Sequence, residues 1–204
     1  MNESKILCRE YESFSAHTPL RMGGNAEKWL WVYSETELIH ILPSLKKQRW
    51  MISWPFQDIL CRNGGYAGTV IRLTGAFTRI EYHKTGVTLG SAALWAQLDM
   101  GFEHAFSDWS GSVGALFARG EEHFLKGYNR TFRWLIGTKI VEETFFSNEL
   151  SAYTTQNAIL LSVRLEGKIR KKKHLPSKTG EIYASSKKES LMDIFIRYQL
   201  LKDF

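Results

Sequence analysis

The chain has 204 residues, of which 44% are hydrophobic, and a formal net charge of +6, as expected for a globular protein with one domain or two small ones. Its apolar runs are short and broken by charge, so none approaches the roughly 20 residues that cross a membrane as a helix. The polar start, MNESKILCRE, lacks the apolar region of a signal peptide, so a cytoplasmic protein is expected.

The first quarter of the chain predicts a strand, a helix and a second strand. The first strand is EKWLWVY at 27–33. Ser34 then has the position of a helix N-cap, with Glu37 as its capping-box partner and apolar residues at helical spacing behind them. Because Pro43 lies inside that pattern, the helix is expected to be kinked or short. RWMIS at 49–53 is the second strand.

The rest of the chain predicts mainly paired strands. A strand at 68–73 follows a turn at Gly64 and Gly65, and residues 77–91 predict a hairpin that turns between Lys84 and Gly86. Mixed helices and paired strands predict the α+β class. The remaining expected elements are a helix at 91–102 that ends at Gly101, strand structure at 135–146 and 157–167, and a terminal helix at 190–204.

Cysteine and histidine spacing predicts neither a disulfide framework nor a metal site. Cys8 and Cys61 are the only cysteines and form no CxxC pair, so both are read as reduced thiols. No two histidines have HxH or HxxxH spacing, so structural or surface roles are favoured. The histidines are His17, His40, His83, His104, His123 and His174.

Positive charge is concentrated in the run KIRKKKH at 168–174. The run holds five of the 27 basic residues: Lys168, Arg170, Lys171, Lys172 and Lys173. Such a run can bind the phosphates of nucleic acid or acidic lipid. The alternative is a solvated linker, which is favoured because no aromatic residues stand among the lysines to stack on bases.

Several motifs together resemble a known family. HTPLRMGGNA at 17–26 resembles the H-T-x-x-R-x-G-G-x-A motif of MurB, the UDP-N-acetylenolpyruvoylglucosamine reductase family of peptidoglycan synthesis. The segments GTVIRL, FTRIEY, VTLGSAA, SGSVGA and NAILLSVRLEG follow in the family's order. One motif alone is weak, but the collinear series extends over about residues 14–167.

The resemblance implies the PCMH-type FAD-binding fold, in which a small α/β lobe and a larger lobe around a mixed sheet hold FAD between them. On this basis residues 1–75 are the small lobe and 76–167 the second lobe. Residues 168–204 are a basic linker and a C-terminal helix, the remnant of a substrate domain. Most of that domain is expected to be missing.

The first FAD-phosphate loop departs from the family pattern. MurB-like enzymes hold the pyrophosphate with a GGGSN loop, whose glycines let backbone N–H groups approach the anion. The corresponding residues are Trp54, Pro55, Phe56, Gln57 and Asp58. Pro55 has no N–H to donate, and Asp58 would place a negative charge beside the phosphates. Trp54 and Phe56 are expected either to fill the cleft or to form an exposed contact patch, and the first alternative is favoured.

The second phosphate-side segment is closer to the family pattern. The family's PGSVGGA resembles the chain from Ser110 to Ala115. Gly111, Ser112, Val113 and Gly114 are therefore the candidate, vestigial cofactor-binding residues, with backbone donors and the Ser112 hydroxyl. The equal alternative is a tight turn that supports packing between the lobes.

The residues that catalyse the family's reaction are not matched. Tyr153 is retained, but Thr154 stands where an arginine is expected and cannot supply its charge. Glu181 follows Gly180 in place of the family's proton-donating serine, and the late glutamate is not found. No catalytic residue is therefore assigned, and the chain is more readily read as a non-enzyme.

Three functions remain as hypotheses. The first is a catalytically inactive MurB-like protein that binds or scaffolds a protein partner, in a setting of peptidoglycan synthesis or cell division. The second is a divergent FAD-dependent oxidoreductase related to UDP-N-acetylmuramate dehydrogenase. The third is anion or nucleic-acid binding through the basic run at 168–174.

Overall fold

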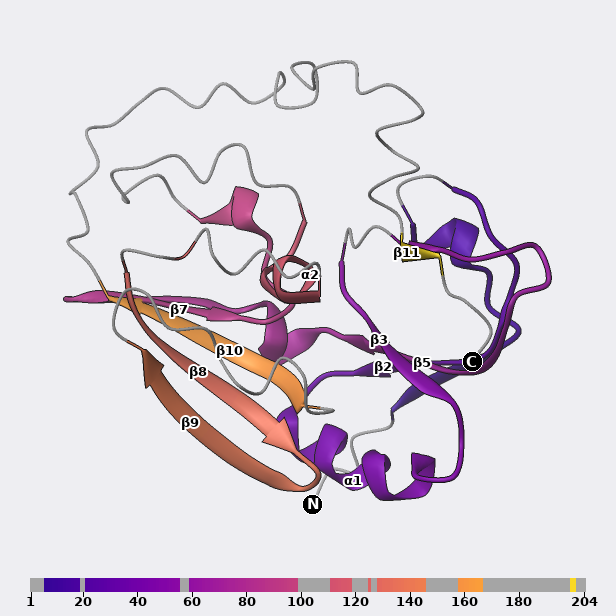
Figure 1. The fold of residues 1–204 in the computed structure, drawn as a ribbon, viewed down its shortest axis with the longest axis horizontal. Helices are drawn as coiled ribbons and strands as arrows, with labels where there is room; N and C mark the ends of the chain where they lie inside the picture. Colours follow the sequence, from indigo (N-terminus) through magenta and orange to yellow (C-terminus); the bar gives the residue numbers. More distant parts are fainter. Residues whose placement is uncertain are drawn as a thin grey trace, which may run out of the picture.

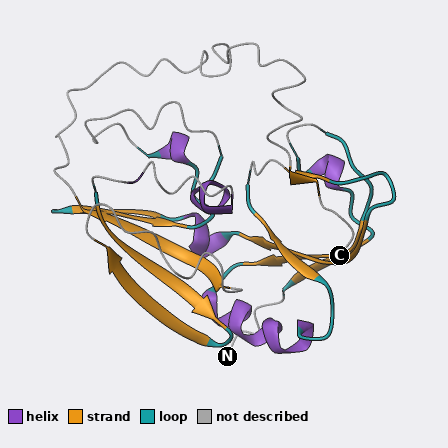
Figure 2. Cartoon of the chain, in the orientation of Figure 1, coloured by secondary structure: helices purple, strands orange, loops and turns teal. Residues whose placement is uncertain are grey.

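The computed structural model describes residues 6–18, 21–55, 59–98, 111–118, 125, 128–145, 158–166 and 199–200. Strands make up most of this described secondary structure, as Figure 2 shows. They form a four-stranded sheet, a five-stranded sheet and one short strand pair. The predicted α+β class with a mixed sheet is confirmed.

The four-stranded sheet comes from the first 73 residues and has the order β1-β2-β5-β3. The parallel strands β2, β5 and β3 lie side by side, and β1 is antiparallel to β2, which makes the sheet mixed (Figure 1). The helix α1 connects β2 to β3. The bounds are β1 Leu7–Glu10, β2 Ala26–Val32, α1 Glu35–Leu45, β3 Trp50–Ser53 and β5 Tyr66–Leu73.

The five-stranded sheet is antiparallel throughout and has the order β6-β7-β10-β8-β9. The six-residue helix α2, Val113–Ala118, packs on its inner face, where the rings of Phe117 and Phe132 meet edge to face at 5.1 Å. The strands are β6 Ile80–His83, β7 Gly86–Gly90, β8 Asn129–Ile136, β9 Lys139–Phe145 and β10 Ala158–Glu166.

Short elements complete the described fold. Three 3-10 helices are η1 Phe14–Ala16, η2 Gly75–Thr78 and η3 Trp95–Gln97. The two-residue strands β4 Ile59–Leu60 and β11 Gln199–Leu200 pair in parallel. No helix within the described ranges is long and apolar enough to cross a membrane.

Alternation along the strands separates a core face from a polar face. In β8, Phe132 and Trp134 are buried, whereas Thr131 and Arg133 face outward and are half-buried. The same alternation in β10 buries Val163. One apolar cluster extends from α1 and β5 across to α2, β8 and β10, so both sheets share this core.

A smaller apolar cluster lies on the other side of the four-stranded sheet. Phe14 and Trp29 are fully buried there, with their rings edge to face at 5.2 Å. His17 from the HTPLRMGGNA motif stacks on Trp29 at 4.3 Å and hydrogen-bonds Glu12 at 2.9 Å, so it braces the start of the fold.

The prediction that Ser34 is the N-cap of α1 is confirmed, but Glu37 bonds the N–H one residue before Ser34 and so does not close the predicted capping box. The Ser34 hydroxyl accepts the Glu37 N–H at 3.2 Å, and the buried Glu37 carboxylate accepts the Tyr33 N–H at 2.7 Å. The helix continues through Pro43 and ends two residues later, at Leu45. The hairpin turn between Lys84 and Gly86 is confirmed as well.

Three predicted elements are wrong within the described residues. Residues 91–98 contain only the short η3 in place of the start of a helix. The region 135–146 is split between β8 and β9 by a turn at Gly137, whose φ is +61°, a value glycine adopts readily. Gln199–Leu200 is a strand, so a continuous helix over 190–204 is not formed.

Candidate functional site

The structure brings together the two segments that were expected to hold the FAD phosphates. Trp54 follows the end of β3 and is only 7% exposed. Its indole ring lies against Gly114, at the second position of α2, so closely that a β-carbon on Gly114 would overlap the ring. Trp54 therefore occupies the space between these two segments, and Phe56, Gln57 and Asp58 lie outside the described residues.

The backbone donors of the 111–115 segment are mostly engaged within the fold. The Val113 N–H donates to the Ala93 carbonyl at 2.9 Å, and the Gly114 N–H donates to the Ser91 carbonyl at 2.6 Å. The Ala115 N–H donates to the Ser112 hydroxyl at 3.3 Å, which uses the side chain expected to contact a cofactor. These groups hold α2 against the turn at 91–93 and do not point at a ligand.

The candidate residues Gly111, Ser112, Val113 and Gly114 thus serve a tight turn and a helix start. Gly111 has a φ of +90°, where only glycine is free of strain, and Ser112, Val113 and Gly114 are buried. A helix of six residues with its first N–H groups already bonded offers little to an anion.

The residues present do not fit an FAD pyrophosphate. Trp54 fills the space that the pyrophosphate would need, and Pro55 has no N–H to donate to it. The N–H groups of Val113 and Gly114 on the opposite segment already donate to carbonyls within the fold. One observation points the other way: the Ser91 hydroxyl is fully buried and has no hydrogen-bond partner among the described residues. A single orphaned hydroxyl does not replace a loop of backbone donors.

Arg72 on β5 anchors the residue that fills this space. Its Nη1 donates to the Trp54 carbonyl at 3.0 Å and to the Ser53 hydroxyl at 3.2 Å. Burial lowers the pKa of Arg72 to about 10, and no carboxylate within the described ranges pairs with it. With this pKa the guanidinium stays charged at neutral pH. Its hydrogen bonds hold the backbone at Trp54, and burying the charge away from water opposes this stabilisation.

A second arginine, Arg130, is buried in the five-stranded sheet. Arg130 at the start of β8 is 1% exposed, on the core face of the sheet, and its guanidinium lies 5.9 Å from the ring of Phe132. Arginine is rarely buried so completely. The sequence does not reveal this burial, because a single arginine in a strand looks the same whether its side chain is buried or exposed.

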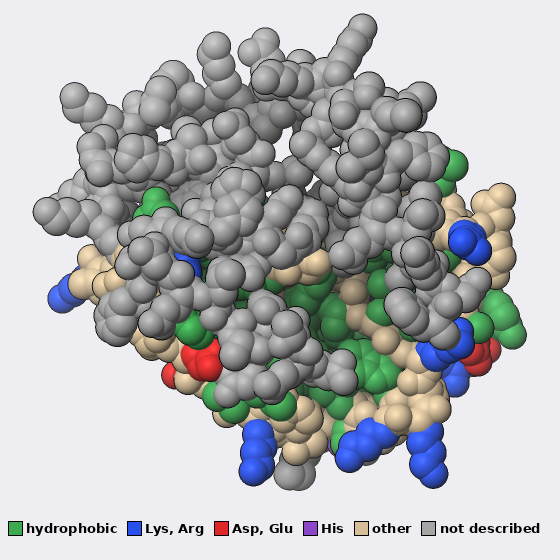
Figure 3. All heavy atoms as spheres, viewed as in Figure 1, with side chains coloured by type: hydrophobic (Ala, Val, Ile, Leu, Met, Phe, Trp, Pro, Cys, Tyr) green, Lys and Arg blue, Asp and Glu red, His purple; other side chains and the backbone are tan. Residues whose placement is uncertain are grey.

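Several predicted site residues lie outside the described part of the chain. These are Tyr153, Thr154, Gly180 and Glu181, with His104, His123, His174 and the basic residues Lys168, Arg170, Lys171, Lys172 and Lys173. On the face shown in Figure 3, the described Lys and Arg side chains stand apart along the rim and form no single basic patch. No group of three metal-ligating side chains occurs within the described ranges.

Comparison with known proteins supports the fold. No protein-family model matches the chain, and no curated protein matches it in sequence. Among solved structures, UDP-N-acetylenolpyruvylglucosamine reductase (MurB) from Thermus caldophilus is similar, with a TM-score of 0.56 and 16% identity over 82% of this chain and 64% of that one.

A second similar structure is GilR in complex with pregilvocarcin, an oxidoreductase that catalyses the terminal step of gilvocarcin biosynthesis. It has a TM-score of 0.54 and 9% identity over 79% of this chain and 40% of that one. The chain thus spans less than two thirds of the length of either protein. At these identities the likeness concerns the fold: the chain has a MurB-like fold of the FAD-binding type.

Proposed function

We propose that this chain is a MurB-like pseudoenzyme that does not use flavin and acts by binding or scaffolding a protein partner. The observation that carries the first half is the contact between Trp54 and Gly114. It fills the space between the two segments that a flavoprotein of this fold would present to the FAD phosphates.

The two-lobe, PCMH-type arrangement belongs to the same proposal. Residues 1–75 and 76–167 are taken as its lobes, and each contributes one of the two sheets. A cytoplasmic setting linked to peptidoglycan synthesis or cell division is part of the proposal and follows from the motif resemblance to the MurB family. The partner half of the proposal is supported by large apolar side chains at the surface, of which Tyr11 is 70% and Met22 57% exposed.

The flavin half is tested with the visible absorption spectrum of the purified chain and a titration with FAD. A colourless protein whose melting temperature does not respond to FAD is expected. Flavin bands, or saturable FAD binding with a rise in melting temperature, would refute it and favour a divergent oxidoreductase, for which the orphaned Ser91 hydroxyl is the supporting observation. Repeating the titration on Trp54→Gly asks whether the indole is the group that excludes FAD.

The partner half requires a separate measurement. The chain is crosslinked in its native cells and compared with a double variant, Tyr11→Ser with Met22→Ser. A reproducible partner that the double variant loses is expected. A binding profile that is the same for both chains, or empty for both, would argue against a scaffold that binds its partner through Tyr11 and Met22.

A further inference from the structure

A small cavity lies on the polar side of the five-stranded sheet, away from α2. Its volume is about 240 Å³, below the range of roughly 300 Å³ and more that is usual for drug-sized ligands, so it suits a small molecule. The charged and hydroxyl groups around it are Glu35, Arg79, Glu81, Thr88, Arg133 and Ser162. They come from α1, the end of η2 and four strands of one sheet.

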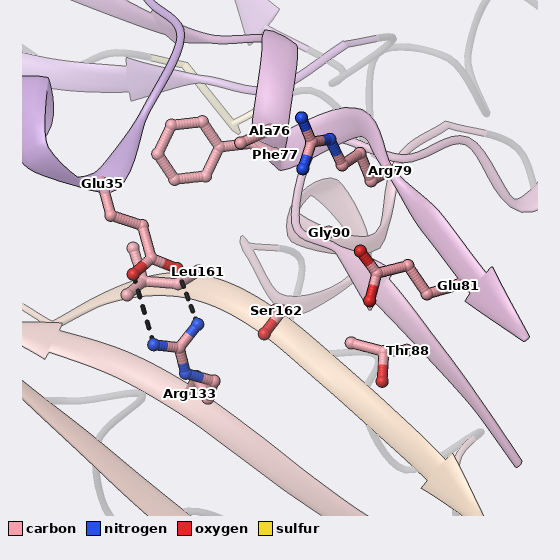
Figure 4. A pocket seen from close by; sticks show the side chains of 10 residues that line it. All are labelled: Glu35, Ala76, Phe77, Arg79, Glu81, Thr88, Gly90, Arg133, Leu161 and Ser162. Carbon is pink, nitrogen blue, oxygen red and sulfur yellow. Dashed lines mark hydrogen bonds and ion pairs between the residues drawn. The ribbon is translucent and has the colours of Figure 1, made fainter. Parts of the chain in front are cut away.

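One side of the cavity is a closed ion pair. Arg133 on β8 donates through both terminal nitrogens to the carboxylate of Glu35 on α1, at 2.7 and 3.2 Å (Figure 4). Its Nε also lies 2.9 Å from Glu142. This guanidinium is already satisfied by two carboxylates, so it is a poor site for a further anion.

The other side carries two charges that are not paired. The side chains of Arg79 and Glu81 form no ion pair or hydrogen bond with any described residue, and Figure 4 shows them across the cavity from Glu35 and Arg133. The backbone of Arg79, directly before β6, is extended, and residues two apart on extended backbone point to the same face, with α-carbons roughly 6.6 Å apart. A cation and an anion are therefore presented side by side.

The floor and centre of the cavity complete the arrangement. Phe77 and Leu161 are each 2% exposed and give an apolar base. The Ser162 hydroxyl has no hydrogen-bond partner among the described residues and lies between the two charged sides (Figure 4). Two arginines and two glutamates line the cavity, so its formal charge is zero.

We propose that this cavity binds a free α-amino acid, with the ligand carboxylate on Arg79 and its ammonium group on Glu81. An α-amino acid holds both charges on one carbon, which matches two opposite charges on one strand face. The Ser162 hydroxyl donates to the ligand carboxylate, and a small side chain lies over Phe77. A phosphate or other polyanion is disfavoured, because Glu35 and Glu81 would repel it.

The site is independent of the proposed loss of flavin binding, because none of its residues belongs to the Trp54 region. The full chain is titrated with glycine, L-alanine and D-alanine by calorimetry, and with acetate and ethylamine as analogues with one charge. Saturable binding of at least one amino acid is expected, with no binding of acetate or ethylamine at equal concentration. Equal binding of the analogues, or no saturable binding of any amino acid, would overturn the proposal.

Matched variants locate the site. Arg79→Gln and Glu81→Gln should each weaken binding by about tenfold or more, since each removes one charge-assisted contact. Lys84→Gln and Glu10→Gln make the same charge changes at exposed positions outside the cavity and should leave binding unchanged. Arg79 and Glu81 are exposed, so the folded state should persist, which circular dichroism checks. Full binding by both glutamine variants would exclude this cavity as the site.

Discussion

The indole ring of Trp54 lies against the α-carbon of Gly114, where no side chain fits without a shift of one of the two segments. Trp54 is part of the segment after β3, and Gly114 is the second residue of α2, 60 residues further along the chain. Two residues that sequence comparison assigns to opposite sides of a cofactor phosphate are thus in direct contact. Because of this packing, the effect of Gly114→Ala on stability should depend on whether residue 54 is tryptophan or alanine.

Gly114→Ala should destabilise the protein by about 1–3 kcal/mol, because the added methyl group collides with Trp54. In a Trp54→Ala background the same substitution should be neutral or stabilise by about 0.5 kcal/mol, since alanine is a better helix former than glycine. Urea denaturation of the four proteins in this cycle measures the coupling. Equal effects of Gly114→Ala in both backgrounds would mean that the two residues do not interact.

Trp54→Ala should cost about 3–5 kcal/mol and leave an apolar cavity, because the side chain is almost fully buried in the shared core. Such a cavity binds small aromatic molecules. Added indole should therefore raise the melting temperature of Trp54→Ala and leave the wild type unchanged. Trp31→Ala, which removes a half-buried indole elsewhere, is the control and should not respond to indole.

Much of the fold follows from local sequence signals. The Ser34 cap, the hairpin at Lys84 to Gly86 and the strand at 157–167 each depend on residues close together in the chain, and each is confirmed. The order of these segments was enough to indicate a MurB-like fold, although sequence identity to the similar MurB structure is only 16%.

The failure at residues 91–98 comes from contacts with a distant segment. Residues 91–98 have apolar spacing that suits a helix, but their backbone pairs with the 111–113 segment: Leu94 bridges Ser112, and the Trp95 N–H donates to the Gly111 carbonyl at 3.2 Å. These bonds to another segment replace the internal bonds of a helix. In the same way, the bulk of Trp54 is visible in the sequence, but its contact with Gly114 depends on how the segment after β3 packs against α2.

The ion pair between Glu35 and Arg133 joins α1 to the five-stranded sheet across 98 positions of sequence. Both side chains are about one-third exposed, at 32% and 35%. A double-mutant cycle with Glu35→Gln and Arg133→Gln should give a coupling of about 0.5–1 kcal/mol. The coupling should fall as salt is added, because solvent reaches the pair.

The pair between Arg164 and Glu166 is the control for that cycle. Its atoms are 3.8 Å apart and both side chains are more than 40% exposed, so a coupling near zero is expected from Arg164→Gln and Glu166→Gln. If the two pairs gave the same coupling, the bidentate geometry at Glu35 would contribute nothing measurable.

The two cysteines should differ in reactivity. Both are free thiols; Cys8 is exposed on the edge strand β1, whereas Cys61 is 4% exposed. Burial raises the pKa of the Cys61 thiol, and a hydrogen bond with the backbone of Gly24 opposes this only in part. A raised pKa leaves less thiolate at a given pH, and the thiolate is the reactive form.

At mildly alkaline pH, iodoacetamide should therefore label Cys8 rapidly and Cys61 only slowly, as mass spectrometry of peptides over time would show. In urea, which exposes both thiols, the two rates should converge. Cys8→Ser is the matched variant and should leave only the slow phase in the folded protein. Rapid labelling of Cys61 in folded Cys8→Ser would show that the segment between β4 and β5 opens readily, and that its burial does not protect the thiol.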